Sequence, residues 1–140
     1  MTTRVIMLID ESGSMSGNES QTISARNEVL NEQKNIELNG EETAPKFSYY
    51  TFSSTLSLPV EFDSIKDVDF SQLLYKPTGT TSLLDAIGDI LKKHERENNV
   101  ILFINTDGEE NSSRKYNTET IKKNLVNYQD NKGWIIHYLG

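Results

Sequence analysis

The chain has 140 residues, a net charge of −7 and no cysteine. This length suits one domain covering residues 1–140, and a hydrophobic fraction of 35% with a charged fraction of 25% is typical of a globular protein. The acidic charge argues against nucleic-acid binding, because phosphates repel it. The lack of cysteine excludes disulfides and thiolate metal sites and favours a cytoplasmic location. No apolar run is long enough to span a membrane.

Three apolar runs predict buried strands of a parallel sheet. They lie at residues 5–9, 100–104 and 134–139. Their lack of alternation is typical of strands that helices cover on both faces. Residues 47–62 instead predict a hairpin, because apolar and polar residues alternate in its second half. Pro59 places that second strand at the edge of the sheet, since proline cannot donate to a central ladder.

Helices are predicted between these strands. The first has capping-box spacing at residues 16–19 and continues towards Leu38. The second begins after Ser82, where the capping pattern repeats, and presents one apolar face. The third is capped near residues 117–118 and ends at Gly133.

The order of these elements predicts an α/β fold with three layers (α/β/α). The sheet would be Rossmann-like, doubly wound and mostly parallel, with one antiparallel edge strand from the hairpin. Right-handed crossovers place the first strand beside the strand at residues 100–104. Ligands of such sheets bind in the crevice where the winding reverses, which here lies beyond Ile9 and Ile104.

Oxygen-bearing residues follow both of these strands. Asp10, Ser12 and Ser14 come after the first strand, and Asp107 comes after the second. Hard cations prefer oxygen ligands, and Mg²⁺ takes about six of them. Because hydroxyls are neutral, a metal held largely by them would still attract an external carboxylate.

The same residues carry a family resemblance. Residues 10–14 resemble the Asp-x-Ser-x-Ser signature of von Willebrand factor type A domains, which are also the inserted domains of integrins. Residues 79–87 resemble the second motif of the family, and residues 106–109 resemble its Thr-Asp-Gly-Glu motif. All three motifs occur in family order, and their sequences are similar to those of small bacterial or phage intracellular members. Taken singly, each residue is equally well explained as a turn or cap residue, but the joint pattern favours a metal site.

The resemblance implies a metal-ion-dependent adhesion site with Mg²⁺ or, as an alternative, Mn²⁺; Ca²⁺ is less favoured. Ser12, Ser14 and Thr81 would bind the metal through their hydroxyls. Asp10 and Asp107 would act largely through bridging waters. The remaining coordination position would be open to an Asp or Glu carboxylate from a partner protein. The rim that meets this partner is expected to contain Glu11, Gly79, Thr80 and Glu109.

Three functions remain open on this evidence. A metal-dependent protein-binding module is favoured, since neither a general base nor a nucleophile accompanies the motifs and an enzyme is not expected. The alternative is a Mg²⁺-dependent phosphoester hydrolase with Asp10 and Asp107 as metal ligands, because a metal can generate the nucleophile itself. The third is a purely structural domain.

The chain departs from the family at its end. Family domains usually continue with a further strand and a long C-terminal helix, which are apparently missing here. The strand at residues 134–139 would then form an uncovered apolar edge. We therefore expect either a longer natural protein or a homodimer that covers this edge. Trp134 is expected to pack in the core or at the edge, and His94 is expected at the surface.

Overall fold

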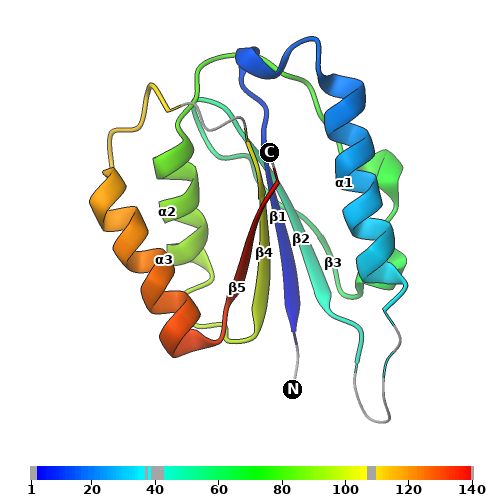
Figure 1. The fold of residues 1–140 in the computed structure, drawn as a ribbon. Helices are drawn as coiled ribbons and strands as arrows, with labels where there is room; N and C mark the ends of the chain where they lie inside the picture. Colours follow the sequence, from blue (N-terminus) through cyan, green and yellow to red (C-terminus); the bar gives the residue numbers. More distant parts are fainter. Residues whose placement is uncertain (1–2, 37, 39–42, 107–109, 140) are drawn as a thin grey trace.

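The computed structural model describes residues 3–36, 38, 43–106 and 110–139. Its sheet has five strands in the order β3-β2-β1-β4-β5 (Figure 1). These strands are β1 (Arg4–Asp10), β2 (Lys46–Phe52), β3 (Val60–Phe62), β4 (Val100–Asn105) and β5 (Ile135–Leu139).

Strand β1 lies at the centre of this sheet and pairs in parallel with both β2 and β4. Strands β4 and β5 are also parallel, whereas β3 is antiparallel to β2 at the edge. The predicted fold class is therefore confirmed, including the single antiparallel edge strand. In this register Ile9 faces Asn105, so the carboxyl ends of β1 and β4 lie side by side.

Helices cover both faces of the sheet (Figure 1). One face carries α1 (Glu19–Lys34), and the other carries α2 (Leu83–Lys93) and α3 (Thr118–Lys132). The side chains of Met7 and Ile9 pack with Leu30 of α1, whereas Ile6 and Leu8 pack with α2 and α3. These four residues of β1 are fully buried. Burial on both faces explains why apolar and polar residues do not alternate in this strand.

The edge strand β3 is shorter than the alternating pattern predicts. Only Val60–Phe62 pairs as a strand, and Leu58 before it is 87% exposed. Pro59 has no N–H to donate, and the hydroxyl of Ser57 accepts the N–H of Thr51 at 2.9 Å. The side chain of Ser57 thus replaces a ladder bond close to the turn.

The first helix differs from the prediction at both ends. The carboxylate of Glu19 accepts the N–H of Gly17 at 2.9 Å, so it does not form the predicted capping box with Ser16. The helix ends at Lys34, before Leu38, and the Lys66 ammonium donates to the carbonyl of Lys34 at this end.

The other two helices agree better with the sequence. Ser82 is the N-cap of α2, although its side chain makes no capping hydrogen bond. Asn117 caps α3 by accepting the N–H of Thr120 at 2.8 Å. Gly133 ends α3 in the left-handed conformation, with φ of 72°, which glycine adopts without strain.

The prediction of a surface position for His94 is wrong. Its side chain is buried, and Nε2 lies 2.8 Å from the hydroxyl of Tyr50 in β2. Its Nδ1 contacts the carboxylate of Glu97, which also accepts from Nε of Arg4 at 2.6 Å. These contacts join the end of α2 to β1 and β2. Trp134 is buried, as predicted.

Strand β5 forms the second edge of the sheet. Ile135 and Tyr138 are 51% and 59% exposed there, so the predicted apolar edge is present. Its cover by a dimer or by further chain stays a prediction. Among the described residues, every helix is too short or too polar to cross a bilayer.

Candidate functional site

Asp10 ends β1 and is fully buried. Its Oδ1 accepts the backbone N–H of Ser12 at 2.8 Å. A short 3-10 helix, η1 (Gly13–Met15), follows directly. The carboxylate of Asp10 is therefore bonded to the start of the loop that carries Ser12 and Ser14.

Backbone hydrogen bonds hold this first loop against its neighbours. The N–H of Glu11 donates to the carbonyl of Phe52 at 2.6 Å, and the N–H of Thr78 donates to the carbonyl of Glu11 at 2.7 Å. The N–H of Gly13 donates to the carbonyl of Gly79 at 2.9 Å. A Cβ on Gly13 would lie 3.3 Å from that carbonyl oxygen, so the close approach of the two loops favours glycine there.

The other carboxylate oxygen of Asp10 is oriented by a residue directly after β4. The hydroxyl of Thr106 donates to Asp10 Oδ2 at 2.9 Å. The hydroxyl of Tyr75 donates to the backbone carbonyl of Asp10 at 2.8 Å. Burial raises the pKa of Tyr75 to about 12, and the nearby charges of Asp10 and Glu11 act in the same direction. The phenol is therefore neutral and able to donate at physiological pH.

The hydroxyl groups of the first loop have a spacing suited to a small cation. Ser12 Oγ and Ser14 Oγ lie 2.9 Å apart. Adjacent ligands of an octahedral ion with bonds of about 2.1 Å lie about 3.0 Å apart. Ser12 and Thr81 are both buried, whereas Ser14 is exposed. The two serines can therefore serve as neighbouring ligands without a change of separation.

The charge of the site also fits a cation. Ion pairs among the described residues all lie elsewhere, and none includes Asp10. A buried carboxylate without a positive partner is unfavourable. A bound divalent ion would supply the missing positive charge.

Solved structures with the same architecture are known. Proximal thread matrix protein 1 from the mussel byssus matches 99% of this chain and 37% of its own, with a TM-score of 0.65 and 15% identity. The ArnB paralog VWA2 from Sulfolobus acidocaldarius matches 99% and 42%, with a TM-score of 0.64 and 20% identity. A von Willebrand factor type A protein from Catenulispora acidiphila matches 98% and 33%, with a TM-score of 0.60 and 13% identity. The chain has the fold of a von Willebrand factor type A domain.

This likeness concerns the fold, since the sequence identities are low. The chain spans between 33% and 42% of the length of these three proteins. No family model and no curated protein matches the sequence. The predicted resemblance to von Willebrand factor type A domains is therefore confirmed at the level of the fold, and the metal site rests on the residues themselves.

The structure brings most of the predicted metal ligands to one end of the sheet. Asp10 and Ser12 lie on the first loop with Ser14, and Thr81 follows the segment that the first loop contacts through Gly79. Of the remaining predictions, Asp107 and Glu109 lie outside the described residues. The described residues contain no cluster of three or more His, Cys, Asp or Glu side chains able to hold a metal. A hydroxyl-rich site with two aspartates is compatible with this finding, because it does not require such a cluster.

The described residues that were predicted to form the rim of the site are polar or exposed. Gly79 and Thr80 are exposed. Glu11 is partly exposed, and its Oε2 accepts the N–H of Lys76 at 2.8 Å. The carboxylate is thus tied to the loop that precedes Gly79.

Two residues of the site were not predicted individually. Thr106 belongs to the third motif, but only the fold shows that it orients Asp10. Tyr75 lies 65 positions from Asp10 in a segment without regular structure. The sequence offers no spacing signal that would connect them.

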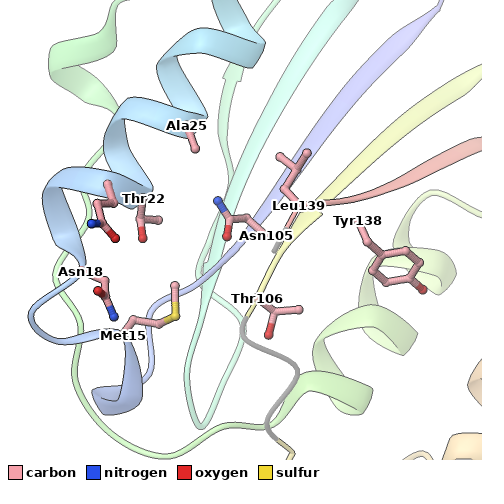
Figure 2. A pocket seen from close by; sticks show the side chains of 9 residues that line it. Met15, Asn18, Thr22, Ala25, Asn105, Thr106, Tyr138 and Leu139 are labelled. Atoms are coloured by element: carbon pink, nitrogen blue, oxygen red, sulfur yellow. The ribbon is translucent and has the colours of Figure 1, made fainter.

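A hollow borders the site on the side of α1 (Figure 2). Its volume is about 700 Å³, and it reaches from Met15, directly after Ser14, to Leu139 of β5. The amide side chain of Asn105 points into it towards α1, as Figure 2 shows. The hollow is wide and partly polar, so the surface beside the predicted metal site is concave.

Proposed function

We propose that this domain is a protein-binding module that depends on a divalent metal and captures an Asp or Glu carboxylate of its partner. Asp10, Ser12, Ser14 and Thr81 would hold the metal together with Asp107. The observation that carries this proposal is the buried carboxylate of Asp10, which lacks an ion pair among the described residues and is bonded to the loop that carries the Ser12 and Ser14 hydroxyls, 2.9 Å apart.

The chemistry of the ligands explains why the partner would be an acid. Ser12, Ser14 and Thr81 are neutral, so the direct ligands would leave the charge of the ion largely uncompensated, with the two aspartates acting on it mainly through water. Both oxygens of Asp10 already accept hydrogen bonds from Ser12 and Thr106, which favours an indirect role through water. When bound, the metal would supply a positive, Lewis-acidic centre that attracts a carboxylate.

The size of the ion follows from the same ligands. A site of about six ligands, five of them supplied by the chain directly or through water and one by the partner, suits Mg²⁺ or Mn²⁺. Ca²⁺ prefers longer bonds of about 2.3–2.6 Å and more ligands. The net charge of −7 argues against a nucleic-acid partner and is compatible with a cytoplasmic protein partner.

Calorimetric titration with Mg²⁺ and Mn²⁺ tests the metal site. We expect binding to the natural sequence and its loss in Asp10→Asn, which removes the buried charge at constant shape. Asp89→Asn is the matched control, because Asp89 lies on α2 and pairs with Lys115, outside the site. Absence of binding at millimolar metal in the natural sequence would contradict the proposal and favour a purely structural domain.

A pull-down with and without chelator tests the binding function. A partner that is retained by the natural sequence, released by chelator and not bound by Asp10→Asn supports the module. The decisive step replaces acidic residues of that partner one at a time by their amides. Hydrolysis of a generic phosphate ester that Asp10→Asn abolishes would instead favour a Mg²⁺-dependent phosphoester hydrolase.

A further inference from the structure

The backbone of Thr81 is held on both sides by a segment far away in the sequence. The side-chain Oδ1 of Asn111 accepts the N–H of Thr81 at 3.0 Å. The backbone N–H groups of Asn111 and Ser112 donate to the carbonyl of Thr81 at 2.9 and 3.1 Å. Both polar backbone groups of Thr81 are therefore bonded to two consecutive residues.

The side chain of Ser112 extends this contact. Its hydroxyl lies 2.6 Å from the hydroxyl of Ser82 and donates to that of Thr80 at 3.0 Å. The residues on either side of Thr81 are thus bonded to the same segment. Rotation of the Thr81 peptide groups would break several of these bonds together.

The segment is also anchored to the start of α2. Glu110 Oε1 accepts the N–H of Leu84 at 3.2 Å, and the hydroxyl of Ser113 accepts the N–H of Asp85 at 2.9 Å. These N–H groups belong to the first turn of the helix, where no helical carbonyl can accept them. Residues 110–113 therefore form a brace between residues 80–82 and the start of α2.

We propose that Asn111 is a positioning residue for the metal ligand Thr81. The inference rests on the proposed function, because it concerns how the same site is prepared for its ion. Threonine is branched at Cβ and has few allowed χ1 angles. By fixing the backbone of Thr81, which is 1% exposed, the brace fixes the direction of its hydroxyl before a metal binds.

The chemistry of asparagine suits this role. The side chain of Asn111 accepts from the same residue to which its own N–H donates, so one residue holds Thr81 at two points. Asn111 itself is exposed, which makes it replaceable without a change in the core. Alanine would leave the Thr81 N–H without its acceptor, whereas aspartate would keep an oxygen at this position.

Amide hydrogen exchange in the presence of chelator tests the brace without metal. We expect the Thr81 amide to exchange about tenfold faster or more in Asn111→Ala, and to regain its protection in Asn111→Asp. Ser113→Ala is a control, because it removes a contact of the brace to Asp85 and leaves the two Asn111 bonds to Thr81. Unchanged exchange of the Thr81 amide in Asn111→Ala would overturn the inference.

Metal titration then tests the consequence for the site. Replacing a residue that orients a metal ligand weakens binding by about 10–100-fold. We expect a loss of this size for Mn²⁺ in Asn111→Ala, with a thermal midpoint close to that of the natural sequence. Equal Mn²⁺ affinity of Asn111→Ala and the natural sequence would overturn the positioning role. A natural sequence that binds no metal would overturn the proposed function and the metal role of Asn111, and the exchange experiment would still decide whether Asn111 fixes Thr81.

Discussion

The hydroxyl of Thr106, at the end of β4, donates to Asp10 Oδ2 at the end of β1 over 2.9 Å. This bond crosses the line where the winding of the sheet reverses, because β1 and β4 belong to opposite halves. Together with the N–H of Ser12 on Oδ1, it fixes the plane of the carboxylate. Any ligand or water that Asp10 binds is oriented accordingly.

We predict that Thr106→Val weakens Mn²⁺ binding by about tenfold, because the carboxylate of Asp10 loses a donor while the shape of the side chain is kept. Thr106→Ser keeps the hydroxyl and is expected to bind nearly as tightly as the natural sequence. Titration calorimetry on the three proteins measures the difference. Equal Mn²⁺ affinities of Thr106→Val and Thr106→Ser would contradict a role of this hydrogen bond in the site.

Ser14 offers a test with a neighbouring control. Its hydroxyl lies 2.9 Å from that of Ser12, and the residue is exposed, so Ser14→Ala removes one proposed metal ligand at little risk to folding. We expect Mn²⁺ affinity to fall by about tenfold or more. Ser16→Ala changes an exposed serine two residues further on and should have no effect. A similar response of both variants would place the metal elsewhere.

Gly88 lies inside α2, where alanine would normally stabilise a helix by about 1 kcal/mol. Here a Cβ would lie 2.4 Å from the ring of Tyr116. We therefore predict that Gly88→Ala destabilises the domain by about 1–3 kcal/mol, as overpacking does. Urea unfolding measures the change. In the background of Tyr116→Ala the same substitution should lose its penalty, and a penalty that persists would assign the effect to another neighbour.

Glu97 makes the stability depend on acid. Burial acts to raise the pKa of its carboxyl, but the bonds from Arg4 and His94 outweigh burial and lower the pKa below 4.5. A carboxylate whose pKa is lowered by folding stabilises the fold at pH values above its pKa in the unfolded chain. This stabilisation is lost as the pH falls through its pKa in the folded protein. We expect urea unfolding below about pH 4.5 to be less pH-dependent in Glu97→Gln than in the natural sequence. Glu95→Gln, at an exposed position, should retain the full dependence.

The sheet was largely predictable from its sequence because its signals are local. The unbroken apolar runs mark β1 and β4, and the cap of Asn117 and the left-handed turn of Gly133 set the ends of α3. The predicted loop residues follow from the strands, since parallel strands deliver their carboxyl ends to one edge.

The remaining features depend on residues that are distant in sequence. Lys66 contacts the last residue of α1 from a position 32 residues away. His94 is buried through its contacts with Tyr50 and Glu97 rather than by its own sequence pattern. Asn111 bonds Thr81 across 30 residues. A single sequence contains no periodicity that pairs such positions, so only the folded chain reveals them.

Several contacts between the loops of the site are made by main-chain atoms alone. Gly13 bonds Gly79 and Glu11 bonds Phe52 and Thr78 through N–H and carbonyl groups alone. Apart from the two glycines, this framework is indifferent to the side chains that project from it. An exposed side chain such as that of Thr78, whose contact is made by its backbone N–H, can therefore be exchanged, in evolution or by design, while the same scaffold persists beneath it.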